Sequence, residues 1–156
     1  MAPNKLLGAI RPILTQNITR RAKAAAIAEA IRVEGGYRWV GLYDVDVQKG
    51  LVSNIAWSGP SAPAYPTFPI TKGLTSRAIA TKATVNAGDV ASDLSYLTAL
   101  ESTRSEIIVP VLDKAGDYVV GTIDVESAHL NAFDSSSQAL LEECARVFAD
   151  FWTTRD

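Results

Sequence analysis

Hydrophobic and polar residues alternate most clearly in two stretches, residues 105–110 and 121–127. Both are rich in branched apolar residues with a period of two, which predicts β-strands. The residues between them include the polar segment 113–117, with Gly116 inside it, which is typical of a short hairpin loop. We therefore expect a β-hairpin from the two stretches and treat it as the centre of the fold.

Three carboxylates interrupt the apolar pattern of this hairpin. Because successive side chains of a strand point to opposite faces, Asp124 and Glu126 should share one face of the second strand. Glu106 should likewise lie on one face of the first strand together with Ile108. Taken singly, each acid could equally be a solvated residue on an outer face. If the three converge, they form an acidic patch suited to an ammonium group, a cation or a hydroxyl-rich ligand.

The N-terminal segment is predicted to form two helices. The first covers residues 5–14, with Pro12 bending or ending it. The second is rich in alanine, takes Thr19 as its N-cap and is closed by Gly35 and Gly36.

Two further strands are expected after these helices. Residues 37–45 alternate so that Trp39, Gly41 and Tyr43 share one face, and residues 51–58 form the hairpin partner. Residues 59–69 contain four prolines and predict a surface loop that ends in a short edge strand.

The middle of the chain combines short elements with one long loop. A helix should begin at 73–75, with Thr75 as its cap, and end at residue 81 or 82. A short strand over 84–87 follows. Residues 88–104 are irregular, and a loop of this length in a compact domain is commonly a lid or a binding loop.

A final amphipathic helix is predicted from its N-cap Asp134 to Trp152. Its apolar stripe is wider than one sheet face should cover, so we expect a homodimer formed through the terminal helices. Cys144 lies within this stripe and should be a small core or interface hydrophobe. The stripe consists of Leu140, Leu141, Cys144, Val147, Phe148, Phe151 and Trp152.

The order of elements along the whole chain predicts an α+β domain with a central antiparallel sheet.

Length and composition agree with a single domain over residues 1–156, with N-terminal helices in 5–34 and a core in 37–152. The apolar share of 47% and the charged share of 21% are ordinary for a globular protein. A net charge of −2 gives no reason to expect nucleic acid as a partner, and no apolar run reaches the roughly 18 residues of a membrane span. We expect a cytoplasmic protein that has no membrane partner.

The cysteine and histidine counts limit the chemistry. With Cys144 as the single cysteine, an intrachain disulfide and a two-cysteine redox cycle within one chain are excluded. One histidine and one cysteine do not supply a structural zinc site. We expect no metal and no cofactor.

Five motifs in sequential order resemble those of a GAF domain, and most closely those of the branch that contains the free methionine-(R)-sulfoxide reductases. The resemblance covers residues 37–152. The motifs are Trp39-Val-Gly-Leu-Tyr43, Ile70-Thr-Lys-Gly-Leu74, Gly88-Asp-Val90, Arg104-Ser-Glu-Ile-Ile-Val-Pro110 and Gly121-Thr-Ile-Asp-Val-Glu-Ser127.

The resemblance implies a six-stranded antiparallel sheet flanked by helices, with a pocket between the sheet and the loop 88–104. In the reductase branch, an aromatic wall and acidic groups hold the substrate and receive its ammonium. The branch usually has Asp where this chain has Glu126, and the longer side chain would shrink the pocket or move the charge. The matching residues here are Trp39, Tyr43, Glu106, Asp124 and Glu126.

The reductase branch also carries cysteines in two regions, which correspond here to residues 57–68 and 95–101. Neither region of this chain contains cysteine. Sulfoxide reduction in that branch needs a thiolate that attacks sulfur and a second thiol that resolves the sulfenic acid. Ser95 or Thr98 cannot replace them, because an alcohol is neither acidic enough nor redox-active. The departure predicts that the reductase chemistry is absent.

The sequence as a whole indicates a stand-alone GAF domain that binds a small polar, amino-acid-like molecule in an acid-lined pocket, with a sensory or regulatory role and no catalysis. A competing interpretation is a structural dimerisation module whose pocket is filled by its own side chains, such as Tyr96, Leu97 or Leu100. The pattern is also compatible with a reductase homologue of unrecognised activity, or with an enzyme that uses the three acids without a thiol.

Overall fold

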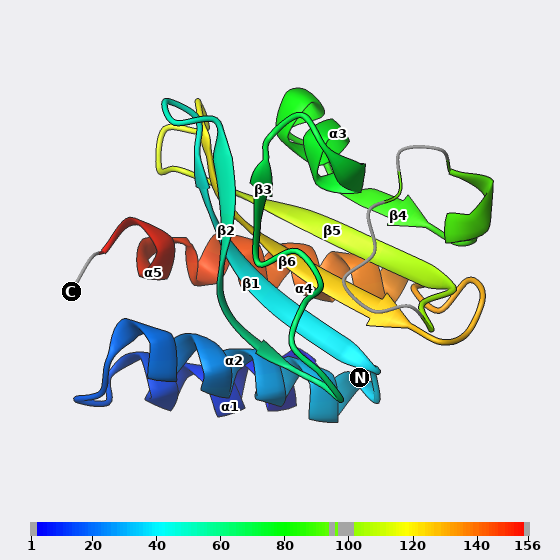
Figure 1. Cartoon of the computed structure of the whole chain (residues 1–156). Helices are drawn as coiled ribbons and strands as arrows, with labels where there is room; N and C mark the ends of the chain where they lie inside the picture. Colours follow the sequence, from blue (N-terminus) through cyan, green and yellow to red (C-terminus); the bar gives the residue numbers. More distant parts are fainter. Residues whose placement is uncertain (1–2, 94–95, 97–101, 155–156) are drawn as a thin grey trace.

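The computed structural model describes residues 3–93, 96 and 102–154. A single six-stranded sheet forms the centre of the molecule, and its strand order is β3-β2-β1-β6-β5-β4 (Figure 1). All neighbouring strands pair antiparallel, which confirms the predicted α+β class. The strands are β1 (Trp39–Asp46), β2 (Leu51–Ser58), β3 (Thr67–Pro69), β4 (Val85–Ala87), β5 (Ser105–Leu112) and β6 (Val119–Ser127).

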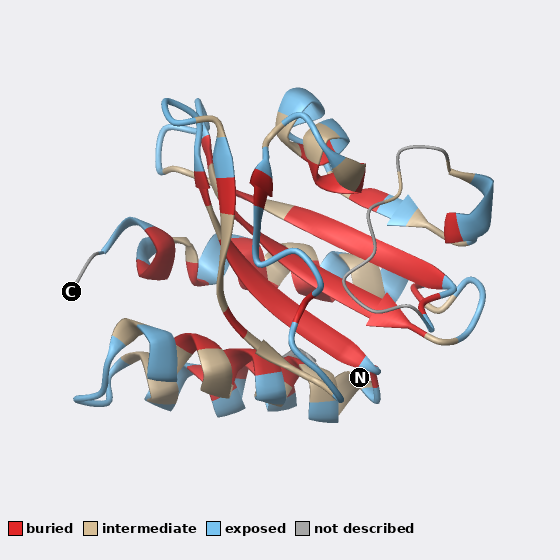
Figure 2. Cartoon of the chain, viewed as in Figure 1, coloured by how far each residue is buried: buried red, intermediate tan, exposed pale blue. Residues whose placement is uncertain are grey.

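Four helices cover one face of the sheet. They are α1 (Pro3–Leu14), α2 (Arg20–Gly35), α4 (Ser135–Val147) and α5 (Ala149–Thr153). The main core lies between them and the sheet, where Val40, Ile107 and Val125 meet Ile27 and Leu141. Figure 2 shows this layer as buried inner surfaces with exposed outer ones. We call this side of the sheet the helix face.

The opposite face is covered by smaller elements. The helix α3 (Gly73–Thr81) packs through Leu74 and Ala78 against Val85 of β4 and Ile108 of β5. The 3₁₀ turn η1 (Val90–Ser92) follows β4. In the part of the chain that is described, no helix has the length and apolar character needed to cross a bilayer.

Two of the three N-caps predicted from sequence are confirmed. Thr19 accepts a hydrogen bond from the backbone N–H of Ala22 at 3.1 Å, and Asp134 accepts one from Ser137 at 2.8 Å. The prediction for Thr75 is wrong. The N-cap of α3 is Lys72, which makes no side-chain capping bond, and Thr75 is buried in the first turn.

The predicted final helix is divided in two at Phe148, whose backbone leaves the helical region at φ −107° and ψ 16°. The break lets α5 turn back onto the sheet. There the indole N–H of Trp152 donates to the carbonyl oxygen of Tyr43 at 3.0 Å. Trp152 lies directly on Gly121, where an added Cβ would stand 2.1 Å from the indole ring. This position of β6 therefore requires glycine.

The apolar stripe of these last helices is buried inside its own chain. Leu141 and Trp152 are no more than 1% exposed, and Phe151 is 8% exposed. Val147 remains outside, at 39% exposed. The apolar stripe that suggested a dimer is thus largely buried within the single chain. The homodimer stays a prediction, and its interface would have to involve residues other than the buried ones of this stripe.

Candidate functional site

The three strand carboxylates lie on the sheet face opposite the helix face. Glu106 of β5 stands directly across from Glu126 of β6, and Asp124 lies two residues before Glu126 on the same side of its strand. Across the other edge of β6, Asp124 pairs with Gly41 of β1. The three therefore share one face, which is the condition stated above for an acidic patch, and we call Glu106, Asp124 and Glu126 the acid cluster. The pocket expected between this face and the loop 88–104 stays a prediction.

Trp39 and Tyr43 flank the acid cluster from β1. Trp39 pairs with Glu126 across the β1–β6 ladder, and the residue between the two aromatics on this face is Gly41. A Cβ added at Gly41 would stand 2.4 Å from the Trp39 ring and 2.9 Å from the Tyr43 ring. Both rings therefore lean over the glycine backbone, beside Asp124. The five residues predicted to form a site are brought together in space.

The aromatic side of this region is well anchored. The indole N–H of Trp39 donates to the carbonyl oxygen of Ser61 at 3.0 Å, which ties the proline-rich loop to the sheet. Tyr43 meets Phe68 of β3 edge to face, with ring centroids 5.9 Å apart. Trp39 and Tyr43 are 0% and 2% exposed, so this part is rigid packing and not an open wall.

Burial and mutual repulsion perturb the ionisation of the acid cluster. Glu106 is 3% exposed, Asp124 6% and Glu126 1%. Desolvation, followed by the charges of Glu126 and Asp124, raises the pKa of Glu106 well above its usual range. Desolvation also raises the pKa of Asp124 from 3.8 to about 8, although the nearby Thr122 hydroxyl opposes the shift. At neutral pH the protonated form of Asp124 is therefore favoured.

Burial, followed by the charges of all three acids, also raises the pKa of Tyr43 well above 10.0. The strand register agrees, since Tyr43 lies two residues after Gly41, the partner of Asp124, and on the same face of the sheet. Tyr43 therefore serves as a neutral neighbour of the cluster.

The hydrogen bonds of the cluster are uneven. Glu126 accepts from the hydroxyls of Thr103 and Tyr96, the latter at 3.4 Å. Asp124 differs, since its Oδ1 atom is buried and has no hydrogen-bond partner at ordinary distance among the described residues. The neighbouring Thr122 hydroxyl, which favours the ionised form of Asp124, is likewise buried without a partner. A buried polar atom without a partner is uncommon and costly in a folded protein. The Oδ1 atom of Asp124 is the strongest structural sign that the face accommodates another group.

The residues that bind Glu126 cannot be identified from the sequence pattern. Thr103 and Tyr96 lie in the irregular segment before β5, where no periodicity indicates which side chain turns inward. Asp93 of this segment also forms an ion pair with Arg77 of α3, at 2.9 Å. The two other side chains expected to plug a pocket, Leu97 and Leu100, lie outside the described residues.

Cys144 lies on the other side of the sheet, in the core of the helix face, and is 1% exposed. Burial, with a smaller contribution from the charge of Glu143, raises the pKa of its thiol to about 12. It is therefore separated from the acid cluster by the sheet and is held as an unreactive thiol.

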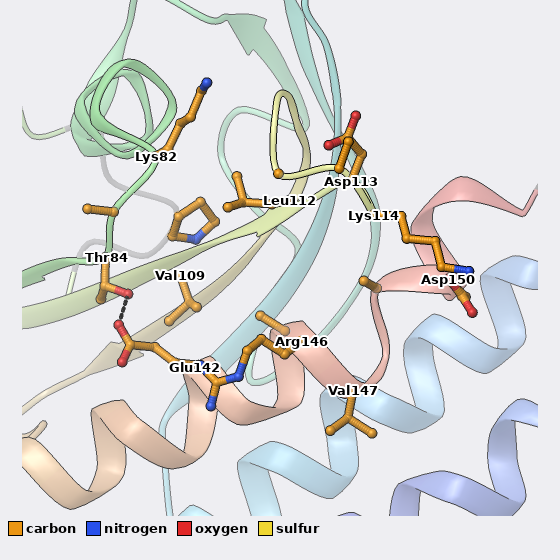
Figure 3. Close-up of a pocket in the computed structure, with 16 residues that line it drawn as sticks. Lys82, Thr84, Val109, Leu112, Asp113, Lys114, Glu142, Arg146, Val147 and Asp150 are labelled. Atoms are coloured by element: carbon orange, nitrogen blue, oxygen red, sulfur yellow. Dashed lines mark hydrogen bonds between the residues drawn. The ribbon is translucent and has the colours of Figure 1, made fainter.

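A separate surface groove of about 790 Å³ lies beside β5, between the end of α3 and helices α4 and α5 (Figure 3). None of the five predicted site residues lines it. Its charged residues have both signs, such as Lys82 and Lys114 against Glu142 and Asp150, and Glu142 accepts a hydrogen bond from Thr84 at 2.6 Å. Within the described residues, no set of His, Cys, Asp and Glu side chains could hold a metal ion.

Comparisons with known proteins identify the family and the fold. A family model for the GAF domain matches residues 17–152. GAF domain-containing protein A of Dictyostelium discoideum is 28% identical over 142 residues, which are 91% of this chain and 87% of that protein.

Solved structures similar to this chain include free methionine-R-sulfoxide reductases. The type II enzyme of Thermoplasma acidophilum is 30% identical with a TM-score of 0.78, covering 85% of this chain and 92% of its own. The enzyme of Neisseria meningitidis, in complex with its substrate, is 26% identical with a TM-score of 0.83, covering 96% and 86%. A GAF domain from an Acinetobacter phosphoenolpyruvate-protein phosphotransferase is 14% identical with a TM-score of 0.82, covering 96% and 91%, and shares the fold. With the family model spanning most of its length, this chain belongs to the GAF domain family.

Proposed function

We propose that this GAF domain is a sensory or regulatory module that binds a small molecule with a primary ammonium group, of amino-acid-like chemistry, at the acid cluster. The observation that carries the proposal is the buried Oδ1 atom of Asp124, which has no partner among the described residues. An ammonium group offers three donors and a positive charge, which would satisfy that atom and favour ionisation of the neighbouring carboxyl groups.

The cost of the cluster supports a ligand role. Two adjacent strands place Glu106 opposite Glu126 inside a protein face where apolar residues would stabilise the sheet better. No described Lys or Arg forms an ion pair with Glu106 or Asp124. Groups whose ionisation is perturbed by burial and by each other are concentrated at functional sites. A cationic ligand is the simplest partner for such a set.

A second candidate, a structural module without a ligand, is favoured by Tyr96. Its ring packs against the cluster of Leu74 and Ile108, and its hydroxyl reaches Glu126. A tyrosine in this position already fills part of the space in front of the acids. In the first function a bound ligand donates a hydrogen bond to Asp124, and in the second no ligand does.

We further propose that the chain has no methionine sulfoxide reductase activity. Its single cysteine is buried in the helix face, and a thiol with a pKa near 12 is scarcely ionised at neutral pH. Purified protein should give no turnover of free methionine-(R)-sulfoxide with dithiothreitol as reductant. Turnover that disappears in Cys144→Ser would contradict this.

The ligand proposal is tested by thermal unfolding with a panel of amino acids, both methionine sulfoxide epimers and nucleotides. At roughly 100 times its Kd, a ligand should raise the Tm by about 5–10 °C. The N-acetylated form of any hit should lose the effect, because acetylation removes the ammonium charge. Asp124→Asn should lose it as well.

The matched control is Glu29→Gln, which removes one carboxylate from the exposed surface of α2. It should respond to the ligand as the wild type does. If no compound shifts the Tm, or if N-acetylated and free amines act equally, ammonium recognition is rejected and the structural module becomes the better explanation.

A further inference from the structure

An open surface pocket of about 550 Å³, called the cavity below, lies at the end of the sheet where β1 begins and β6 ends. Arg32 of α2, Arg38 just before β1 and His129 just after β6 line it, together with Ser127. Ser127 alternates with Glu126 along β6, so its side chain points to the helix face and away from the acid cluster. The cavity is therefore distinct from the acid cluster.

Two serine hydroxyls hold the arginines at this cavity. The Nε–H of Arg32 donates to the hydroxyl of Ser58 at 2.8 Å, and that of Arg38 donates to the hydroxyl of Ser102 at 2.9 Å. Each guanidinium has four further N–H donors. Among the described residues, Arg32 donates only to Ser58 and Arg38 donates only to Ser102. The serines thus orient the two planar groups while leaving their outer donors for another molecule.

The cavity carries positive charge in a protein whose net charge is −2. Among the described residues, no Asp or Glu lines it, and neither Arg32 nor Arg38 forms an ion pair. Arg32 stands in the last turn of α2, where the helix dipole favours a cation and opposes an anion. The dipole at the C-terminus of α2 is equivalent to about half a negative elementary charge, whereas each arginine carries a full positive charge. The balance remains in favour of an anion.

We propose that this cavity binds the phosphate group of a small phosphorylated molecule. Two guanidinium groups offer about eight outer N–H donors, more than the two oxygens of a carboxylate can use. A phosphate monoester has three terminal oxygens and a charge of about −1.5 to −2, which matches two arginines. The volume exceeds that of one phosphate and falls within the usual range for small-molecule sites. Tyr37, which is buried, and the small residues Gly36, Gly59 and Pro60 also line the cavity.

The test follows the arginine Nε–H signals of the ¹⁵N-labelled protein by NMR while inorganic phosphate or pyrophosphate is added at constant ionic strength. The signals of Arg32 and Arg38 should shift together and saturate, with a Kd of about 1 mM or below for pyrophosphate. Arg32→Gln and Arg38→Gln should each weaken binding at least about tenfold, because each removes charge-assisted hydrogen bonds.

The matched control is Arg21→Gln, which removes the same charge from an exposed position about 16 Å away along α2. Its affinity should equal that of the wild type, and the amide spectra of all variants should remain those of a folded chain. Equal weakening in Arg21→Gln, absence of saturation in the wild type, or succinate binding as tightly as pyrophosphate would overturn the phosphate site. These signals are independent of ligand binding at the acid cluster.

Discussion

Ile123 and Asp124 are neighbours in β6, yet they belong to two different regions of the molecule. Ile123 points into the helix face, where four helices bury an almost entirely apolar core. Asp124 points to the other face, where it is buried with two glutamates and where one of its oxygens has no described partner. The helix face contributes stability through burial of apolar area, whereas the acid cluster reduces it. The same strand thus supports the fold with one side and offers chemistry with the other.

The largest expected change in stability comes from removing a side chain that packs α5 onto the sheet. Trp152→Ala removes a fully buried ring and its hydrogen bond to Tyr43, and should lower the free energy of unfolding by about 3–5 kcal/mol. Urea unfolding measures the change.

Trp152→Phe separates the two contributions, since it keeps most of the ring and leaves the Tyr43 carbonyl without its donor. Its cost should be about 1–3 kcal/mol. A change below about 1 kcal/mol for Trp152→Ala would show that the helix face does not depend on this residue.

In the acid cluster, by contrast, a substitution is expected to raise the free energy of unfolding. Asp124→Asn keeps the shape and removes the ionisable group, so it should raise stability at pH 8 by a few kcal/mol. The folded-state pKa of Asp124 is raised from 3.8 to about 8. The destabilisation from Asp124 should therefore be absent below pH 4, grow as the pH rises, and level off above pH 8, where the folded carboxyl is also ionised.

The measurement is chemical unfolding of both proteins between pH 4 and pH 9. The stability gap between Asp124→Asn and the wild type should be absent near pH 4 and widen toward pH 8. Exposed Glu29→Gln should show no such gap. If Asp124→Asn is less stable than the wild type at pH 8, the carboxylate has a stabilising partner and the comparison between the faces fails.

A smaller effect is expected at Cys144, the single thiol of the helix face. With its pKa near 12, the native thiol should react with a disulfide reagent at pH 8 on the order of 10³-fold more slowly than in urea-unfolded protein. Cys144→Ala should cost about 1–2 kcal/mol through lost packing. Rapid labelling of the folded protein would instead indicate that this face opens.

The smallest effect on stability is expected at the outer surface of the terminal helices. Val147→Asp changes a residue that is 39% exposed and should alter the free energy of unfolding by less than about 0.5 kcal/mol. If the expected homodimer uses the apolar residues left outside, this variant should convert it to monomer. Light scattering at micromolar concentration measures the mass in solution, and a wild-type mass near 16.7 kDa contradicts the dimer.

Local pattern was sufficient for most elements and for the faces of the strands. The alternation of residues 121–127 correctly separated Ile123 and Val125 from Asp124 and Glu126, because a strand turns successive side chains to opposite sides whatever surrounds it. The caps at Thr19 and Asp134 follow from bonds within one turn of helix. The motifs also indicated the GAF family, which the family model confirms.

What the tertiary structure decided depends on residues far apart in the chain. Periodicity alone extends the last helix through Phe148, but burial of Phe151 and Trp152 against the sheet required a break there. Periodicity identifies the acids but not their burial, the raised pKa of Glu106 and Asp124, or the hydrogen bond from Thr103 to Glu126. Arg32, Arg38 and His129 carry no shared motif and meet only when α2, β1 and β6 are packed. Periodicity reports the direction of a side chain, whereas its solvation and its partners are set by the long-range contacts of the folded chain.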